Sequence, residues 1–240
     1  MTSLAPYGAS MALDAGTLRE AEESLNKSGY AVLPGLLTTE ESEDLVAMYS
    51  SNNLYRSRVV MARHGFGLGE YKYFKYPLPA KLNTLREALY PPLAVIANRW
   101  NARMRINVSY PSSLRDLLER CHEAGQIKPT PLILKYNQDD YNCLHQDLYG
   151  EHVFPLQLAI LLAQPDQDFT GGEFVMTETK GTVQRAEVVP LHKGDGVIFT
   201  VNQRPVSGER GDRKVRMRHG VSRIRSGDRH TIGLIFHDAQ

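Results

Sequence analysis

The pattern of apolar and polar positions changes near the middle of the chain. Up to about Pro129 it contains long stretches of helix-forming residues, and beyond it short apolar or alternating runs separated by Gly, Pro and Asp. Helices are predicted over Leu13–Lys27, from an N-cap at Thr38 to about Tyr49, over Leu82–Arg103 and over Leu114–Glu123. Pro91 and Pro92 are expected to interrupt the third helix, because proline lacks the backbone N–H and clashes with the preceding turn.

Strands are expected mainly in the second half. The front half offers Tyr30–Leu33 and the alternating run Gly69–Tyr76. Six further strands are predicted at Pro131–Asn137, Val153–Ala163, Gly172–Thr177, Gly196–Val201, Lys214–Ile224 and Arg229–Phe236. Many short strands without intervening helices are typical of an all-β sandwich or barrel.

The predicted fold class is therefore α+β. A double-stranded β-helix, or jelly roll, is expected to form the core at residues 128–240, and the N-terminal helices are expected to pack on one of its sheets. Residues 1–127 are interpreted as mainly helical support with short strands. Because no segment has the composition of a linker, residues 1–240 are expected to form a single domain.

Composition narrows the class of protein. Hydrophobic residues make up 42% and charged residues 23% of the 240 residues, which is typical of a globular protein and argues against disorder. The two cysteines are too few for a disulfide framework and indicate a reducing compartment. Met1–Gly16 lacks the pattern of a secretory signal, and Val153–Ala163 is too short to span a bilayer as a helix. We therefore expect a soluble cytoplasmic protein without membrane association.

His145-Gln146-Asp147 is the first candidate for chemistry. Residues i and i+2 of an extended strand point to the same side, so this imidazole and carboxylate can converge on one cation. With 8 His and 27 acids among 240 residues, about one such pair arises by chance. A surface turn with a hydrogen-bonded histidine is therefore the alternative interpretation.

His219 lies in a strand candidate whose other odd positions are apolar. Val215, Met217 and Val221 share its face, so period-two alternation predicts a buried imidazole. Such a group needs a partner, either a backbone carbonyl or a metal already held by His145 and Asp147. Two imidazoles and one carboxylate leave open coordination positions and suit non-haem Fe(II), whereas a structural zinc takes four closed ligands.

Arg229 follows His219 by ten residues. If the connection crosses to an opposing sheet, both side chains can point into one cavity, where an inward arginine needs an anion such as the far carboxylate of a dicarboxylate co-substrate. Tyr136 lies on a strand that leads toward His145, and its hydroxyl can bond a bound carboxylate. A surface arginine on an edge strand and an ordinary half-buried strand tyrosine are the alternatives.

The combined motif resembles that of the Fe(II)/2-oxoglutarate-dependent dioxygenases. The matching phrases are His145-x-Asp147, His219, Gly-x-Arg-x-Thr at Gly227–Thr231, Gly171–Phe174 and Gly194–Phe199. Residues 219–236 look closest to the prolyl 4-hydroxylase branch, and Tyr136 ahead of Leu-His-Gln-Asp is similar to the AlkB branch. The runs Tyr136–Tyr149 and Arg218–Arg223 resemble a bacterial and fungal group catalogued as oxygenases acting on alkylated DNA.

This resemblance implies an enzyme that couples the decarboxylation of 2-oxoglutarate, to succinate and CO2, with hydroxylation of a C–H bond by O2. The implied Fe(II) ligands are His145, Asp147 and His219. The implied 2-oxoglutarate residues are Arg229, Thr231 and Tyr136. Ascorbate is an accompanying reductant in this interpretation. If the substrate is an N-methyl base, hydroxylation of the methyl group gives a hydroxymethyl product that releases formaldehyde. The base is thereby demethylated, as in DNA repair.

The chain departs from the AlkB pattern on both sides of Tyr136. Asn137-Gln138 stands where AlkB relatives usually have Pro-Gly, and Leu134 stands where they usually have asparagine. The resemblance therefore supports the co-substrate site of this chain more strongly than it supports a substrate pocket like that of the AlkB relatives.

Charge distribution bears on the substrate. The segment from Arg204 to Arg229 contains nine basic and three acidic residues, a local charge of +6 in a chain whose total is +1. Arg216 and Arg218, on the strand face opposite His219, can follow a phosphate backbone. Tyr71, Tyr73 and Phe74 can stack a single-stranded or flipped base. A solvated basic face and aromatic sheet packing are the plainer interpretations.

Three substrate classes therefore remain open at this point: an alkylated nucleic-acid base, a peptide in the manner of prolyl hydroxylases, and a small molecule. An alternative from another class is a non-catalytic jelly-roll module that binds a ligand or partner. That alternative predicts weak iron binding and no oxygen consumption.

Overall fold

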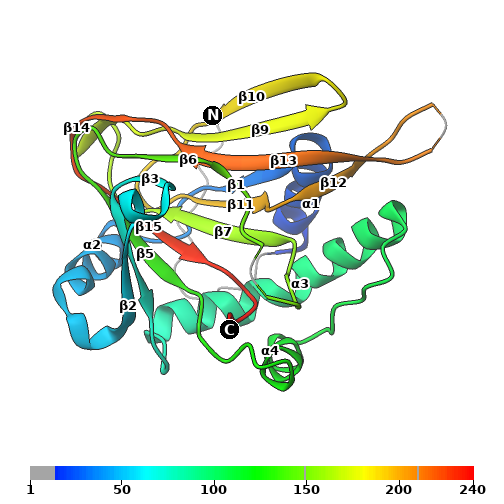
Figure 1. The fold of residues 1–240 in the computed structure, drawn as a ribbon, viewed down its shortest axis with the longest axis horizontal. Coiled ribbons are helices and arrows are strands. Elements are labelled where there is room, and N and C mark those ends of the chain that lie inside the picture. The colour runs from blue at the N-terminus through cyan, green and yellow to red at the C-terminus, as the bar shows by residue number, and fades with distance from the viewer. Residues whose placement is uncertain (1–13, 149, 210) are drawn as a thin grey trace.

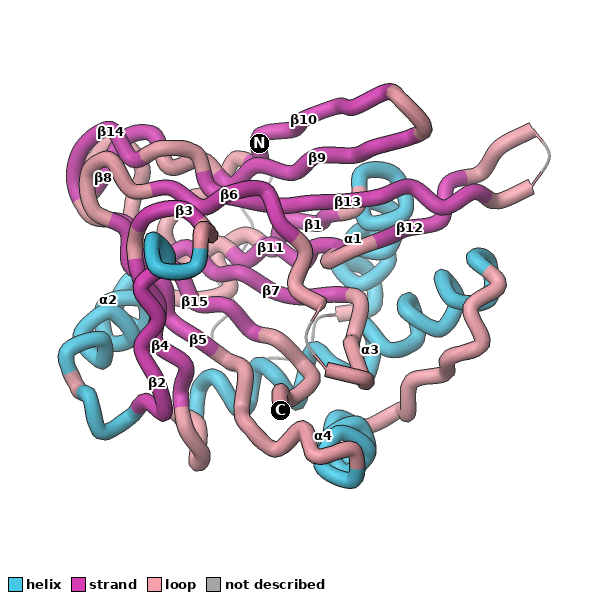
Figure 2. The backbone as a smooth tube through the Cα atoms, in the orientation of Figure 1, coloured by secondary structure: helices cyan, strands magenta, loops and turns pink. Residues whose placement is uncertain are grey.

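The computed structural model describes residues 14–148, 150–209 and 211–240. Residues 1–13 lie outside these ranges. They include Leu13, the predicted start of the first helix, and most of the segment Met1–Gly16, which was interpreted as lacking a secretory signal. Two antiparallel sheets face each other, and helices cover the outer face of one of them (Figures 1 and 2). This mixed architecture with a jelly-roll core confirms the predicted fold class.

The larger sheet has seven strands. Their order is β1 (Tyr30–Leu33), β11 (Gly196–Thr200), β7 (Leu156–Leu161), β15 (Arg229–Leu234), β5 (Leu132–Tyr136), β4 (Glu70–Phe74) and β2 (Tyr55–Val60). Three of these strands, β1, β2 and β4, come from the front half of the chain. The sheet therefore joins residues from both sides of the boundary expected near residue 128.

The second sheet has six strands. Their order is β10 (Val183–Val189), β9 (Phe174–Lys180), β13 (Arg213–Val221), β6 (Tyr141–His145) and β3 (Gly67–Leu68), and β12 (Gln203–Val206) pairs with β13. A separate ribbon consists of β8 (Phe169–Gly171) and β14 (Ile224–Gly227). Because β14 lies between β13 and β15, the chain crosses from the six-stranded to the seven-stranded sheet between His219 and Arg229.

The α-helices of the described ranges are α1 (Ala15–Ser28), α2 (Thr39–Ala47), α3 (Ala80–Met104) and α4 (Leu114–Glu123). Short 3-10 helices lie at Met48–Ser50, Asn52–Leu54 and Met61–His64. The predicted N-cap at Thr38 is confirmed, since its hydroxyl accepts from the backbone N–H of Glu41 at 3.2 Å. Among the helices of the described residues, none is long and apolar enough to cross a bilayer.

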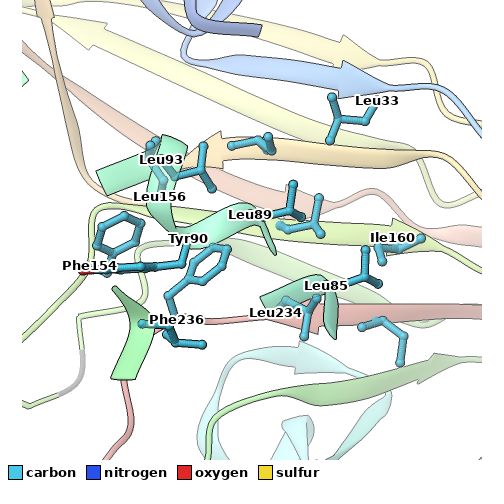
Figure 3. Packing of buried hydrophobic residues seen from close by; sticks show 14 of the residues in the cluster. Leu33, Leu85, Leu89, Tyr90, Leu93, Phe154, Leu156, Ile160, Leu234 and Phe236 are labelled. Carbon is cyan, nitrogen blue, oxygen red and sulfur yellow. The ribbon is translucent and has the colours of Figure 1, made fainter. Parts of the chain in front are cut away.

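The predicted interruption of α3 at Pro91 and Pro92 is wrong, because the helix runs through both prolines. An interior proline costs about 3 kcal/mol. The flanking side chains Leu89, Tyr90 and Leu93 are buried against the seven-stranded sheet (Figure 3), and each contributes about 1.5–3 kcal/mol. Burial of this face therefore outweighs the lost backbone bonds.

Alternation along β7 divides the core in two. Leu158 and Ile160 belong to the cluster between the seven-stranded sheet and the helices, whereas Ala159 and Leu161 belong to the cluster between the two sheets. Residues one position apart thus face different layers, as expected for a strand. The second layer contains the site described next.

Candidate active site

Two histidines pair across neighbouring strands of the six-stranded sheet. His145, the last residue of β6, is the cross-strand partner of His219 in β13, and their ring centroids lie 4.2 Å apart. Asp147 follows β6 directly, and its two carboxylate oxygens lie 3.4 Å from Nε2 of His145 and of His219. One ligand atom from each of the three residues falls within 4.8 Å of the others. The structure therefore brings the predicted metal ligands together.

Two of these three groups are held in the protonation state that metal binding requires. Burial alone would raise the pKa of Asp147, but hydrogen bonds from His145 and His219 outweigh it and hold that pKa well below the usual value. Burial lowers the pKa of His219 and favours its neutral form. Burial alone would lower the pKa of His145, but its hydrogen bond to Asp147 and the charge of that carboxylate raise it. Metal ligands must be an ionised carboxylate and neutral imidazoles, so Asp147 and His219 are held in the required state, whereas a cation must compete with a proton for His145.

Neighbouring groups fix the orientation of the imidazoles. Nδ1 of His145 lies 2.8 Å from the carbonyl oxygen of Cys143, and when it donates this bond it leaves Nε2 free to bind a cation. The His219 ring packs 4.6 Å from the Phe199 ring and 6.0 Å from the Phe174 ring, measured between centroids. These contacts limit rotation of both ligands.

Arg229 is a buried cation in the same cavity. Its side chain is 2% exposed, and one Nη atom donates to the Thr231 hydroxyl at 2.6 Å. Its Nε has no partner, and no carboxylate of the described residues lies within 4.0 Å of it. Burial lowers its pKa to about 10, so it remains charged at neutral pH. A buried charge without a counter-ion is costly and marks a site for an anion.

Tyr136 completes this end of the cavity. It is the register partner of Arg229 across β5 and β15, and the guanidinium carbon lies 5.7 Å from the centre of its ring. The Asn142 amide donates to its hydroxyl at 3.4 Å. Burial raises the pKa of Tyr136, so the hydroxyl stays neutral and can donate to an anion held by Arg229.

A cavity of about 230 Å³ connects these groups. All six residues predicted to bind metal or co-substrate line it: His145, Asp147, His219, Arg229, Thr231 and Tyr136. The donor set fits Fe(II), because two imidazoles and a carboxylate leave open positions, and the unpaired guanidinium fits a co-substrate with a distal carboxylate. The structure therefore brings the predicted metal ligands and the predicted co-substrate residues to one cavity.

The residues predicted to contact substrate are spread over several surfaces. Tyr71 and Tyr73 line the cavity and meet edge to face with centroids 5.3 Å apart. Phe74 lies on the opposite face of β4, fully buried against Tyr55 in the core beneath the helices. It has no surface left for a base, so the proposed contact is kept for the two tyrosines alone.

Arg216 and Arg218 occupy a different surface. Both are exposed, and they alternate along β13 with the inward-facing Val215, Met217 and His219. They therefore point away from the cavity, on the outer face of the six-stranded sheet. Arg210, another member of the basic segment, lies outside the described residues.

Sequence reasoning did not select several cavity residues. Phe66 and Asn142 line the cavity wall, and Arg56 contacts this wall through Tyr73, with its guanidinium carbon 4.2 Å from the centre of that ring. Gln157 lines the cavity as well, and a signal for it was present, because it interrupts an otherwise apolar strand. The others could not be found from local pattern alone, since their place depends on how the strands pair.

The chain is similar to known proteins over most of its length. The model of a family named Oxygenase-NA, described as an oxygenase catalysing oxidative methylation of damaged DNA, matches residues 69–239. Uncharacterized proteins from two strains of Mycobacterium tuberculosis are each 48% identical over 167 residues, which cover 69% of this chain and 72% of each relative.

Solved structures with low sequence identity share the fold. A 2OG-Fe(II) oxygenase family oxidoreductase from Burkholderia pseudomallei has a TM-score of 0.55 at 14% identity and covers 94% of both chains. A prolyl-4-hydroxylase from Pseudomonas putida has a TM-score of 0.52 at 13% identity, covering 93% of this chain and 99% of the other.

Proposed function

Because this chain belongs to the Oxygenase-NA family of oxygenases, we propose that it is an Fe(II)- and 2-oxoglutarate-dependent enzyme that oxidatively demethylates alkylated nucleic-acid bases. The observation that carries the proposal is a triad of potential metal ligands in one cavity with a buried guanidinium that has no counter-ion. Either group alone has a structural explanation. Together they match the needs of a metal and a dicarboxylate.

The metal-binding residues are His145, Asp147 and His219. Asp147 supplies negative charge to a cation, and its position between the imidazoles spaces the three ligand atoms. The Cys143 carbonyl and the rings of Phe174 and Phe199 keep the imidazoles oriented. Preorganisation of this kind reduces the conformational freedom lost when the metal binds.

The co-substrate residues are Arg229, Thr231 and Tyr136. Arg229 offers Nε and an Nη atom to the distal carboxylate of 2-oxoglutarate, while Thr231 holds its other Nη atom in place. The neutral Tyr136 hydroxyl donates a further bond. Apolar walls around these groups exclude water and strengthen the ion pair.

Bound Fe(II) and 2-oxoglutarate supply the oxidising chemistry, in which one atom of O2 enters succinate and the other enters the substrate C–H bond. When the substrate is an N-methyl base, the product is an N-hydroxymethyl base. Loss of formaldehyde from it restores the unmodified base. The protein's own contribution is to hold the methyl group near the metal site and to exclude water.

A nucleobase is the substrate class that these surroundings favour. Tyr71 and Tyr73 present aromatic rings to an otherwise largely apolar cavity, which suits a flat heterocycle. The family description, which refers to damaged DNA, agrees with this choice. Arg216 and Arg218, on the outer sheet face, are proposed to contact the phosphate backbone of a nucleic-acid strand that reaches around the sheet edge.

Two free cysteines support a reducing cytoplasm as the location of the protein.

A mass-spectrometric screen tests this proposal. The enzyme, Fe(II), ascorbate and 2-oxoglutarate are incubated with single-stranded oligonucleotides that contain 1-methyladenine or 3-methylcytosine, and separately with proline-containing peptides. The expected result is loss of the methyl mass from an oligonucleotide with one succinate formed per methyl group removed. Hydroxylation of a peptide with no change in any oligonucleotide would overturn the substrate class.

A further inference from the structure

Gln157 is a polar residue of the cavity wall that neither the metal site nor the Arg229 site uses. Its side chain is 4% exposed, and it lines the cavity. Its amide nitrogen is buried without a hydrogen-bond partner in the described part of the chain. A buried amide without a partner is unfavourable, and an apolar residue of similar volume would avoid that penalty.

The strand register places Gln157 beside the metal site. It pairs directly with Phe199 across β7 and β11, and the Phe199 ring packs 4.6 Å from the ring of the metal ligand His219. Directly opposed residues of antiparallel strands point to the same face, so Gln157 and Phe199 both face the layer between the sheets.

Gln157 lies at a distance from Arg229 and Thr231, the residues proposed to bind the co-substrate. Thr231, the partner of Arg229, pairs with Leu161 across β15 and β7. Gln157 is four residues along β7 from Leu161, which corresponds to about 13 Å at the rise of a strand. A co-substrate held between the metal ligands and Arg229 therefore extends away from Gln157. The Gln157 amide remains available to a second molecule, the substrate.

A row of paired residues connects Tyr73 with the strand that carries Gln157. Across the seven-stranded sheet, Tyr73 of β4 pairs with Leu132, Leu132 with Gly233, and Gly233 with Ala159. All four line the cavity. The Leu132 side chain packs over Gly233, since a Cβ added there would lie 3.3 Å from its Cγ. The row ends at Ala159, two residues from Gln157 along β7, so Tyr73 and Gln157 lie on the same wall of the cavity.

We propose that Gln157 is a specificity-determining residue that donates a hydrogen bond to an acceptor on the edge of the bound base, while Tyr71 and Tyr73 contact its rings. This inference rests on the proposed function and deepens it, because it assigns the polar contact that recognises the base. A ring nitrogen or exocyclic oxygen of an alkylated base is the chemical group that a neutral amide donor fits.

The test compares Gln157→Met with a matched control, Gln184→Met, which changes the same residue type on the exposed strand β10. Three quantities are measured for each metal-loaded enzyme: the KM and kcat for an oligonucleotide containing 1-methyladenine, the affinity for 2-oxoglutarate, and the melting temperature without oligonucleotide. For Gln157→Met we expect a loss of about tenfold or more in kcat/KM for the oligonucleotide. We expect an unchanged 2-oxoglutarate affinity and a melting temperature equal to or above that of the wild type.

A structural role for Gln157 predicts the opposite combination. A lower melting temperature together with weakened 2-oxoglutarate binding, or unchanged kinetics on the oligonucleotide, would overturn the assignment while the wild-type enzyme still demethylates. If the wild type binds Fe(II) and 2-oxoglutarate but demethylates no oligonucleotide, the proposed function fails, and the assignment of a base to Gln157 fails with it. Gln157→Glu provides a second variant, because it keeps the shape but replaces the donor with an acceptor, and it should also lose turnover.

Discussion

Arg229 stands opposite Tyr136 in the pairing of β15 with β5, and both side chains face the layer that contains the metal-ligand triad. The triad itself is held by the six-stranded sheet and its adjoining loop, so the two halves of the cavity come from different sheets. The packing of the two sheets sets the distance from Arg229 to His145 and His219. An anion held by Arg229 would therefore be presented to the proposed metal site from a fixed position.

Replacement of Arg229 by methionine should stabilise the protein when co-substrate is absent. The variant removes a buried charge that has no carboxylate partner, and we expect a gain of ~1–2 kcal/mol in the free energy of unfolding. For a domain of this size that corresponds to a rise of ~2–8 °C in melting temperature. Differential scanning calorimetry checks this value.

The same variant should no longer respond to 2-oxoglutarate. In the wild type, saturating 2-oxoglutarate raises the melting temperature through binding to the folded state, whereas Arg229→Met should show a much smaller shift. Thr231→Val is a milder companion, because it removes only the hydroxyl that positions the guanidinium. Equal thermal shifts in the wild type and Arg229→Met would contradict the role given to this arginine.

His237 should make the stability of the protein depend on pH. The Phe154 backbone N–H donates to its Nδ1 at 3.1 Å, so this nitrogen must be unprotonated in the folded chain. Burial lowers its pKa to about 4, below the ordinary value of 6.5. Between pH 6.5 and pH 4 the unfolded chain therefore binds a proton at this histidine that the folded chain does not bind. The contribution of neutral His237 to stability is fully present above pH 6.5 and is lost as the pH falls toward 4. The loss amounts to ~3 kcal/mol at most.

Urea denaturation at pH 7.5, 6.0 and 5.0 measures this effect. His237→Gln keeps an acceptor for the Phe154 N–H but cannot be protonated, so its stability should fall less steeply over the same range. His230, whose pKa burial also lowers to about 4, remains in both proteins and accounts for a residual slope. Parallel pH profiles for the wild type and His237→Gln would refute the prediction.

The ion pair between Arg86 and Asp238 should be the most sensitive structural contact outside the cavity. Both side chains are almost fully buried, and Arg86 also donates to the carbonyl oxygens of Ile235 and Phe236. Arg86→Met leaves the carboxylate of Asp238 without its guanidinium and should cost ~3–5 kcal/mol in the free energy of unfolding. Chemical denaturation provides the measurement.

A double variant separates the charge from the packing. Arg86→Met combined with Asp238→Asn removes both charges, and it should recover part of the stability that the single variant loses. Because Ile235 lines the cavity, the single variant should also weaken substrate turnover. A double variant less stable than Arg86→Met would show that the buried charge is not the cause.

The proposed metal ligands could be selected from the sequence because their signals are local. His145 and Asp147 stand two residues apart, and His219 interrupts an apolar strand face, so period-two alternation places all three. The helix at Leu114–Glu123 was predicted with the bounds that the structure gives, since its N-cap and amphipathic pattern are also local. For these elements, the sequence pattern was sufficient to predict which face of the strand or helix each residue occupies.

The rest depends on tertiary pairing. The strand β10 is mostly exposed and carries no alternation to reveal it, and β2 and β6 gain their strand structure from their neighbours. Phe74 was grouped with Tyr71 and Tyr73 as an aromatic cluster, although it lies one residue from Tyr73 and therefore faces the other side of β4. The run through Pro91 and Pro92 likewise depends on burial that only the folded sheet provides.

Anaerobic titration of Fe(II) and 2-oxoglutarate into the protein tests the central claim most directly. The wild type should develop a visible charge-transfer band that requires both additions, and His145→Ala should lose it. His192→Ala, which alters an exposed histidine outside the triad, should retain the band. A wild type that develops no band, or a His145→Ala protein with the same band, would contradict the assignment of His145, Asp147 and His219 as the ligands of a catalytic iron.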